Sequence, residues 1–245
     1  MRVIDGDDAR VGEVPWQVAI KVFLCNAIQC QTMSCGGSIW DETTIITAAH
    51  CIPQRAGLQT ILNVCIGSVR LDDPNRVCYR AIDAIIHPGW NPRYFVNDIA
   101  IIKVSRMNIP MVSRTGGLLA NNVCEPKRSN YMGSFVVSGF GRNSRYSHNQ
   151  SNRLQIAQLV PAGDACRQVN PYFDEKTQLC LKGIQGETAC QGDSGGPVTY
   201  INEEGHHELV GVVSYGRQDC PRHGGVAYTN VHAYLSFIKQ YAGNL

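Results

Sequence analysis

The chain has 245 residues, of which 44% are hydrophobic and 17% are charged. Its 22 basic and 20 acidic residues nearly balance, so its net charge of +2 gives no reason to expect nucleic acid or an anionic membrane as a partner. No apolar run reaches the ~18 residues of a membrane-spanning helix, and the length suits one large domain or two small ones.

The sequence contains 11 cysteines spread over its whole length, and none of them forms a Cys-x-x-Cys pair. So many cysteines without metal-binding spacing favour disulfides, and therefore an oxidising compartment and a secreted, extracellular protein. The number is odd, so at least one cysteine lacks a partner within the chain. The basic Arg2 precedes no continuous apolar stretch, so no signal peptide is recognisable, and we expect a longer precursor.

Short segments rich in Val and Ile predict strands, because they are bounded by Gly, Pro, Asn and Asp and are too short for helices. Examples in chain order are 43–49, 61–67, 81–89, 98–104, 133–141 and 208–216. The stretch 197–213 predicts a hairpin with its turn near 202–205. A clear helical pattern occurs only near the C-terminus, where Val231, Tyr234, Leu235 and Ile238 fall on one face.

A polar, irregular segment from about Arg114 to Asn130 divides the strands into two groups. The pattern therefore predicts an all-β protein with two barrels and a terminal helix.

Three short strings carry side chains suited to nucleophilic catalysis. Ser194 lies between glycines in "ACQGDSGGPV", with Asp193 beside it; His50 ends "IITAAH"; and Asp98 begins the strand "DIAIIKV". A serine needs a base to take its proton and donors to stabilise the resulting oxyanion, and a histidine base needs a carboxylate to orient it. Taken singly, His50 and Asp98 are more often structural residues, whereas the full Gly-Asp-Ser-Gly-Gly-Pro string favours catalysis.

The strings "TAAHC", "NDIAII" and "GDSGGP", in that order, resemble those of the trypsin/chymotrypsin family of serine proteases. The resemblance spans nearly the whole chain, through "VIDG", "PWQV", "CGGSI", "SYG" and "AYTNVHAYLSFI". It implies two antiparallel six-stranded β-barrels with the active site in the cleft between them, and a C-terminal helix. The expected ranges are roughly 18–115 and 130–230 for the barrels and 231–242 for the helix.

The same resemblance implies the roles of the site residues. Ser194 is expected to attack the substrate and form an acyl-enzyme, His50 to act as base and then acid, and Asp98 to orient His50. The backbone N–H groups of Gly192 and Ser194 are expected to form the oxyanion hole. The segment expected to pair with the substrate backbone is Ser214, Tyr215 and Gly216.

The segment "RVIDG" resembles the activation junction of the family. Met1 and Arg2 are expected to be a propeptide remnant, with the peptidase domain covering 3–245. Cleavage after Arg2 by a trypsin-like protease would free the Val3 ammonium to pair with Asp193, so the uncut chain is expected to be zymogen-like around Asp193.

The resemblance implies three disulfides, Cys35–Cys51, Cys166–Cys180 and Cys190–Cys220. Two further pairs, Cys25 with Cys30 in a local loop and Cys65 with Cys78 across a hairpin, are expected with less support. Cys124 aligns with the cysteine that tethers a propeptide or an upstream domain in some relatives. A free thiol at Cys124 is the alternative.

The primary specificity pocket is expected to have Thr188 at its floor, with Ala189 beside it and Gly216 leaving one wall open. Neither floor residue is charged, so we expect no preference for Arg or Lys before the scissile bond. An ungapped alignment places Val226 in the other wall and favours small or medium aliphatic residues, whereas a shifted alignment places Gly225 there and admits aromatic residues. Phe95 is expected to line the adjoining subsite.

No metal or cofactor is expected. Asp72 and Asp73 lie where some relatives bind calcium, but their loop is too short to wrap such an ion, and a zinc role for His206 and His207 is equally disfavoured. Asn149 begins a glycosylation sequon.

The expected partners are protein or peptide substrates, an activating protease, protein protease inhibitors and a propeptide or domain attached through Cys124. A silent homologue that acts as a binding protein is the main alternative to an active endopeptidase. A third possibility is the catalytic part of a larger regulatory protease.

Overall fold

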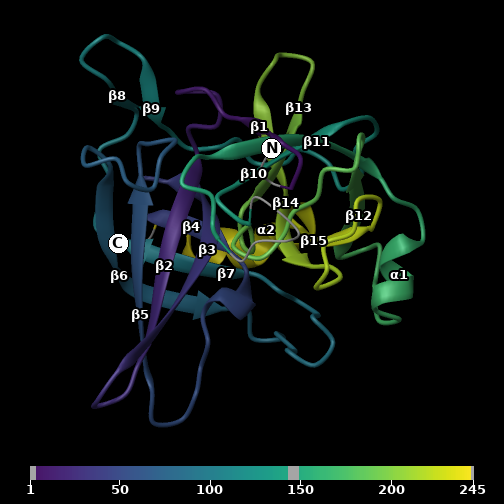
Figure 1. Cartoon of the computed structure of the whole chain (residues 1–245), viewed down its shortest axis with the longest axis horizontal. Helices are drawn as coiled ribbons and strands as arrows, with labels where there is room; N and C mark the ends of the chain where they lie inside the picture. Colours follow the sequence, from purple (N-terminus) through teal and green to yellow (C-terminus); the bar gives the residue numbers. More distant parts are fainter. Residues whose placement is uncertain (1–3, 143–148, 244–245) are drawn as a thin grey trace.

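Two closed β-barrels lie side by side in the computed structural model, which describes residues 4–142 and 149–243 (Figure 1). The first barrel has the strand order β2-β3-β4-β7-β6-β5. Its strands are β2 (Gln17–Cys25), β3 (Cys30–Asp41), β4 (Thr44–Thr47), β5 (Gln59–Ile66), β6 (Val77–Ile86) and β7 (Ala100–Val104). A short 3₁₀ helix, Ala49–Cys51, follows β4.

The second barrel has the order β11-β10-β13-β14-β15-β12 and is closed by the pairing of β11 with β12. Its strands are β10 (Phe135–Gly139), β11 (Gln155–Pro161), β12 (Gln178–Gly183), β13 (Pro197–Ile201), β14 (His207–Tyr215) and β15 (Val226–Asn230). The short β1 (Asp7–Asp8) pairs with the outer edge of β11. Because every pairing within the barrels is antiparallel, the prediction of two antiparallel six-stranded barrels is confirmed.

Alternating side chains explain how the strands close around their cores. In β2, Val18, Ile20 and Val22 are buried inside the first barrel, whereas Lys21 between them is exposed. This period of two is that of a strand with one solvated face. β7 is buried along its whole length, including Lys103, the single charged residue in an otherwise apolar strand.

The β13–β14 hairpin was predicted, and its turn is closed by the Asn202 N–H, which donates to the His206 carbonyl. Several elements were not among the predicted segments, including the barrel strands β2, β3, β11, β12 and β15. The helix α1 (Ala165–Val169) is too short for a helical period to emerge, and the supposedly irregular segment contains part of a two-stranded sheet, β8 (Met111–Val112) with β9 (Leu118–Ala120).

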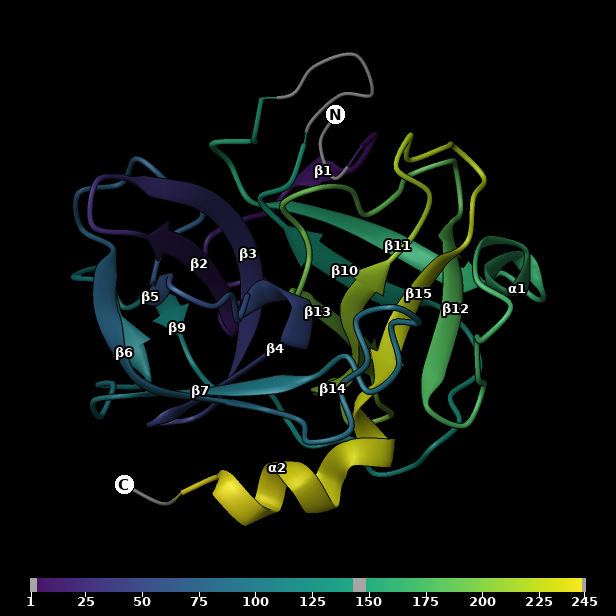
Figure 2. The same cartoon turned by 90° about the horizontal axis from the view of Figure 1, so that it is seen from below.

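The C-terminal helix lies against the first barrel although it follows the second in sequence (Figure 2). It begins with a 3₁₀ turn, Val231–Tyr234, and continues as α2 (Leu235–Tyr241). Lys103 of β7 is buried, and its Nζ donates to the carbonyl of Tyr241 at 3.0 Å and to the hydroxyl of Thr44 at 2.9 Å. These contacts fasten the end of α2 to the first barrel. No helix among the described residues is long and apolar enough to cross a membrane.

Candidate active site

His50 and Asp98 meet at the junction of the two barrels. His50 lies in the 3₁₀ turn after β4, and Asp98 lies two residues before β7. The His50 Nδ1 is 2.8 Å from Asp98 Oδ2, and the His50 backbone N–H donates to Asp98 Oδ1 at 3.0 Å. The two contacts fix the orientation of the imidazole and leave its Nε2 free of the aspartate.

Asp98 is only 1% exposed, and residues of the second barrel hold it. The Ser214 hydroxyl donates to Asp98 Oδ2 at 2.5 Å, and the Thr229 hydroxyl donates to the Asp98 carbonyl at 2.7 Å. The Ser214 hydroxyl stabilises the buried carboxylate and Thr229 holds the main chain, so the second barrel positions the side chain that contacts His50.

Ser194 lies on the loop before β13 and lines the same cleft as His50. Its carbonyl accepts a hydrogen bond of 2.7 Å from Gly36 of β3, so the loop is fastened to the first barrel. Among the described residues, the Ser194 hydroxyl forms no hydrogen bond. Catalytic contacts are often long in the absence of substrate.

The peptide before Gly192 is oriented by the Arg142 N–H, which donates to the Gln191 carbonyl at 2.9 Å. The C=O and N–H of a trans peptide point in opposite directions, so the Gly192 N–H points away from Arg142. Gly192 has a φ of +97°, a conformation that glycine adopts without strain. The N–H groups of Gly192 and Ser194 have no acceptor within the described part of the chain, so both remain available to a ligand.

Asp193 is completely buried beside Ser194. Its carboxylate accepts hydrogen bonds from the N–H groups of Gly141 at 2.7 Å and Cys190 at 2.9 Å. A Cβ atom at Gly139 or Gly141 would lie 2.0 or 2.4 Å from the Asp193 oxygens, so these glycines make the space for the carboxylate. Burial raises the pKa of Asp193 to about 6, and the two backbone donors offset this only in part. Arg2 and Val3, the expected activation residues, lie outside the described residues.

The cleft that contains His50 and Ser194 has a volume of about 500 Å³, and Val226 rather than Gly225 lines it. A Cβ atom at Gly216 would lie 3.2 Å from a Val226 methyl group, so the two residues face each other. Gly225 instead packs against the sulfur atoms of Cys166 and Cys180.

Ala189, Ser214, Tyr215 and Gly216 also line the cleft, as the sequence predicts. Thr188 does not. It is buried, and its N–H donates to the carbonyl of Ile4 at 3.1 Å in an isolated β-bridge. Thr188, which was expected to form the pocket floor, is therefore paired through its backbone with the N-terminal segment.

The comparison with protein families agrees with this architecture. The trypsin family model matches residues 3–238. The chain belongs to the trypsin family.

Three curated relatives resemble almost the whole chain. A CLIP domain-containing serine protease B4 from Anopheles gambiae is 33% identical over 97% of this chain and 69% of its own length. Chymotrypsin-C from Rattus norvegicus is 29% identical over 98% of this chain and 88% of its own. The venom peptide isomerase heavy chain from Agelenopsis aperta is 28% identical over 97% and 99%. The chain is therefore similar to proteins of a family of serine endopeptidases.

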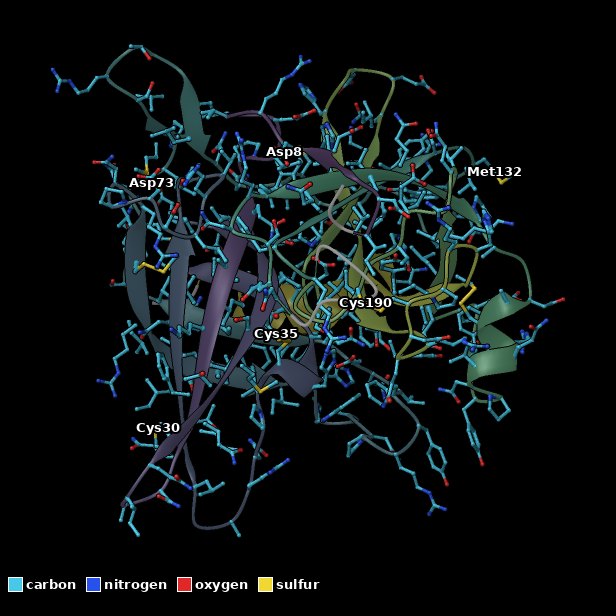
Figure 3. The ribbon with its side chains drawn as sticks, in the orientation of Figure 1. Asp8, Cys30, Cys35, Asp73, Met132 and Cys190 are labelled. Atoms are coloured by element: carbon cyan, nitrogen blue, oxygen red, sulfur yellow. A yellow bond between two sulfur atoms is a disulfide. The ribbon has the colours of Figure 1, made fainter. Side chains whose placement is uncertain are left out.

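Five disulfides join the described cysteines of this trypsin-family chain. The pairs are Cys25–Cys30, Cys35–Cys51, Cys65–Cys78, Cys166–Cys180 and Cys190–Cys220, and each is a pair named in the sequence analysis. Figure 3 shows Cys35 and Cys190 near the middle of the molecule, whereas Cys30 lies at the far end of the β2–β3 hairpin. Cys124 is exposed and has no disulfide partner among the described cysteines.

Other polar residues singled out in the sequence are engaged locally. Arg70 donates to both carboxylate oxygens of Asp72 at 2.9 and 2.8 Å, and Ser68 donates to Asp73 at 2.6 Å. His207 Nδ1 lies 2.8 Å from the Thr199 hydroxyl. Asn149 is exposed.

Several residues that line the cleft were not identified from the sequence: Arg93, Val169, Asn170, Gln191, Val213, Arg217 and Gln218. Most lie next to predicted residues, so a scan of the neighbours of each motif would have found them. Val169 and Asn170 are different, because Val169 ends the unpredicted helix α1, Asn170 follows it, and only the folded second barrel brings them to the cleft.

Proposed function

We propose that this chain is a secreted serine endopeptidase in which Ser194, His50 and Asp98 form the catalytic triad. The observation that carries the proposal is the 2.8 Å contact between His50 and the buried Asp98, in a cleft that Ser194 also lines. A histidine oriented in this way can act as a general base toward a serine beside it.

In the proposed reaction, Ser194 Oγ attacks the substrate carbonyl carbon while His50 Nε2 takes the hydroxyl proton. The imidazolium is stabilised by Asp98, and the oxyanion accepts hydrogen bonds from the N–H groups of Gly192 and Ser194. Transfer of the proton from His50 to the leaving amine breaks the peptide bond and leaves an acyl-enzyme. Water, activated by His50, then releases the acid and restores Ser194.

We propose activation by cleavage after Arg2, carried out by a trypsin-like protease. The buried Asp193 supports this proposal, because its raised pKa marks a carboxylate that lacks a compensating cation within the described residues. The freed Val3 ammonium would supply that cation. A buried carboxylate left unpaired costs roughly 3–5 kcal/mol, which is enough to disfavour an ordered active site before cleavage.

The proposed substrates have an uncharged residue before the scissile bond. No Asp or Glu lines the cleft in the described part of the chain, and Val226 narrows the space opposite Gly216. Small or medium aliphatic side chains such as those of Ala and Val therefore fit this wall better than Phe or Tyr.

The five disulfides support secretion, because such bonds persist in oxidising compartments. We also propose that the exposed Cys124 bonds to a propeptide or an upstream domain, that Asn149 carries a glycan, and that proteins or peptides act as substrates and inhibitors. A binding protein without activity is the alternative function, supported by Val226, which narrows the cleft opposite Gly216 and would restrict access to it.

Cleavage-site profiling distinguishes the two functions. The protein is treated with trypsin, loss of Met1 and Arg2 is confirmed by mass, and trypsin is inhibited before a diverse peptide library is added. An active protease cuts after Ala, Val, Thr or Leu, and S194A treated in the same way does not. Cutting after Phe or Tyr would overturn the narrow-pocket proposal, and inactivity with a free Val3 would support the binding protein.

A further inference from the structure

Arg93 lines the catalytic cleft, and the reaction proposed above does not use it. It lies two residues before Phe95, whose ring contacts His50 with a centroid separation of 5.8 Å and Tyr215 at 5.3 Å. Arg93, Phe95 and Tyr215 line the same cleft. Because Tyr215 belongs to the segment proposed to pair with substrate before the scissile bond, Arg93 belongs to that side of the cleft.

The segment that presents Arg93 is fastened to the second barrel. The Asn170 side-chain amide donates to the Tyr94 carbonyl at 2.7 Å, and the Gln178 amide donates to the Phe95 carbonyl at 3.0 Å. The Tyr94 ring also packs on Tyr172 with a centroid separation of 4.1 Å. A side chain on such an anchored segment loses less entropy on binding a ligand than one on a free loop.

The charges around the cleft are unbalanced. Its basic lining residues within the described chain are His50, Arg93 and Arg217, and no Asp or Glu is among the lining residues. Arg217 is neutralised by Asp219, with two hydrogen bonds of 3.0 and 2.9 Å. Arg93 has no carboxylate partner in the described residues, and its guanidinium lies 5.4 Å from the centre of the Tyr94 ring.

We infer that Arg93 forms a subsite for an acidic side chain of the substrate, two to four residues before the scissile bond. This inference rests on the proposed endopeptidase function. It adds a second specificity requirement to the proposed preference for an uncharged residue directly before the scissile bond. The guanidinium can donate two parallel hydrogen bonds to one carboxylate. The neighbouring Phe95 and Tyr215 rings exclude part of the solvent that would otherwise screen the pair.

Matched substrates test the subsite. A peptide with Ala before the scissile bond is made with Glu or Gln at the second, third or fourth preceding position, six peptides in all. The ratio of kcat/KM for each Glu peptide to its Gln partner is measured at low and at high salt. At one position we expect a ratio of about 3–5 at low salt, mainly through KM, because a partly exposed ion pair contributes modestly and is screened by salt.

Two variants test whether Arg93 causes the preference for Glu over Gln. R93Q should bring that ratio to about 1, and R93E should reverse it. R55Q is the matched control, since Arg55 is an exposed arginine outside the catalytic cleft and its loss changes the net charge equally. A ratio near 1 at every position in the active wild-type enzyme, or one that survives in R93Q, overturns the subsite alone. Absence of cleavage in all six peptides and in the diverse library overturns the endopeptidase itself.

Discussion

Asp98 illustrates how a single side chain depends on both barrels. Its buried Oδ2 lies close to both the Ser214 hydroxyl and the His50 ring, whereas the Thr229 hydroxyl donates to its neutral main-chain carbonyl. Hydrogen bonds to charged groups contribute ~1.5–3 kcal/mol to stability and neutral ones ~0.5–1.5 kcal/mol.

We therefore expect S214A to lower the free energy of unfolding by ~1.5–3 kcal/mol and T229V by ~0.5–1.5 kcal/mol. Urea unfolding at neutral pH measures both values. Equal losses in the two variants would mean that the charge of Asp98 does not strengthen its contact with Ser214.

Asp193 should give the intact chain, with its Arg2–Val3 bond uncut, an unusual pH dependence. Its pKa of about 6 lies above the ordinary value of 3.8, so the folded state holds this proton more tightly than the unfolded state. The stabilisation is complete below about pH 3.8 and is lost as the pH rises through about 6, a total of ~3 kcal/mol.

Unfolding experiments between pH 4 and 7 on the uncut wild type and D193N isolate this contribution, because other carboxylates titrate equally in both proteins. Wild type should lose stability relative to D193N as the pH rises. Parallel pH profiles for the two proteins would contradict the prediction.

At the scale of elements, the disulfides differ in the length of chain that they close. Cys25–Cys30 spans 5 residues at the tip of the β2–β3 hairpin, and Cys190–Cys220 spans 30 residues beside the cleft. Chain-entropy estimates give ~2 kcal/mol for the short loop and ~4 kcal/mol for the long one.

Replacing each pair by two serines should therefore lower the free energy of unfolding more for Cys190–Cys220. Only that variant should also lose peptidase activity, because both cysteines line the catalytic cleft. Urea unfolding and a peptidase assay of the two variants check the order, and a larger effect at the hairpin tip would reverse it.

The sequence predicted strands that contain short Val- and Ile-rich runs, whereas the alternating strand β2 was not among the predicted segments. β4 and β7 are buried throughout, β5 buries Leu62, Val64 and Ile66, and all three strands were expected. α1 was missed because five residues cannot display a helical period. The lining of the pocket was harder to predict from the sequence. The pairing of Thr188 with Ile4 depends on where the N-terminal segment packs, and no local pattern encodes that contact.

At the scale of the whole molecule, α2 should control the stability of both barrels. Ile238 is fully buried in the core cluster that contains Val18, Ile45 and Ile102 of the first barrel, although it lies in the helix that follows the second. I238A should lower the free energy of unfolding by ~2–5 kcal/mol, because it leaves a cavity in that core.

Ser236 is exposed on the same helix, so S236A provides the control and should change stability by less than ~0.5 kcal/mol. Differential scanning calorimetry should show one transition in both variants. A second, separate transition in I238A would mean that the helix stabilises only one barrel.

The hydrogen bond from buried Lys103 to the Tyr241 carbonyl has a further consequence for the molecule's motions. Through this bond α2, which follows the second barrel in sequence, is attached to the first barrel. Neither barrel can then unfold without detaching α2. Amide hydrogens in the cores of both barrels should therefore exchange with solvent at the same slow rate, through one unfolding event of the whole protein.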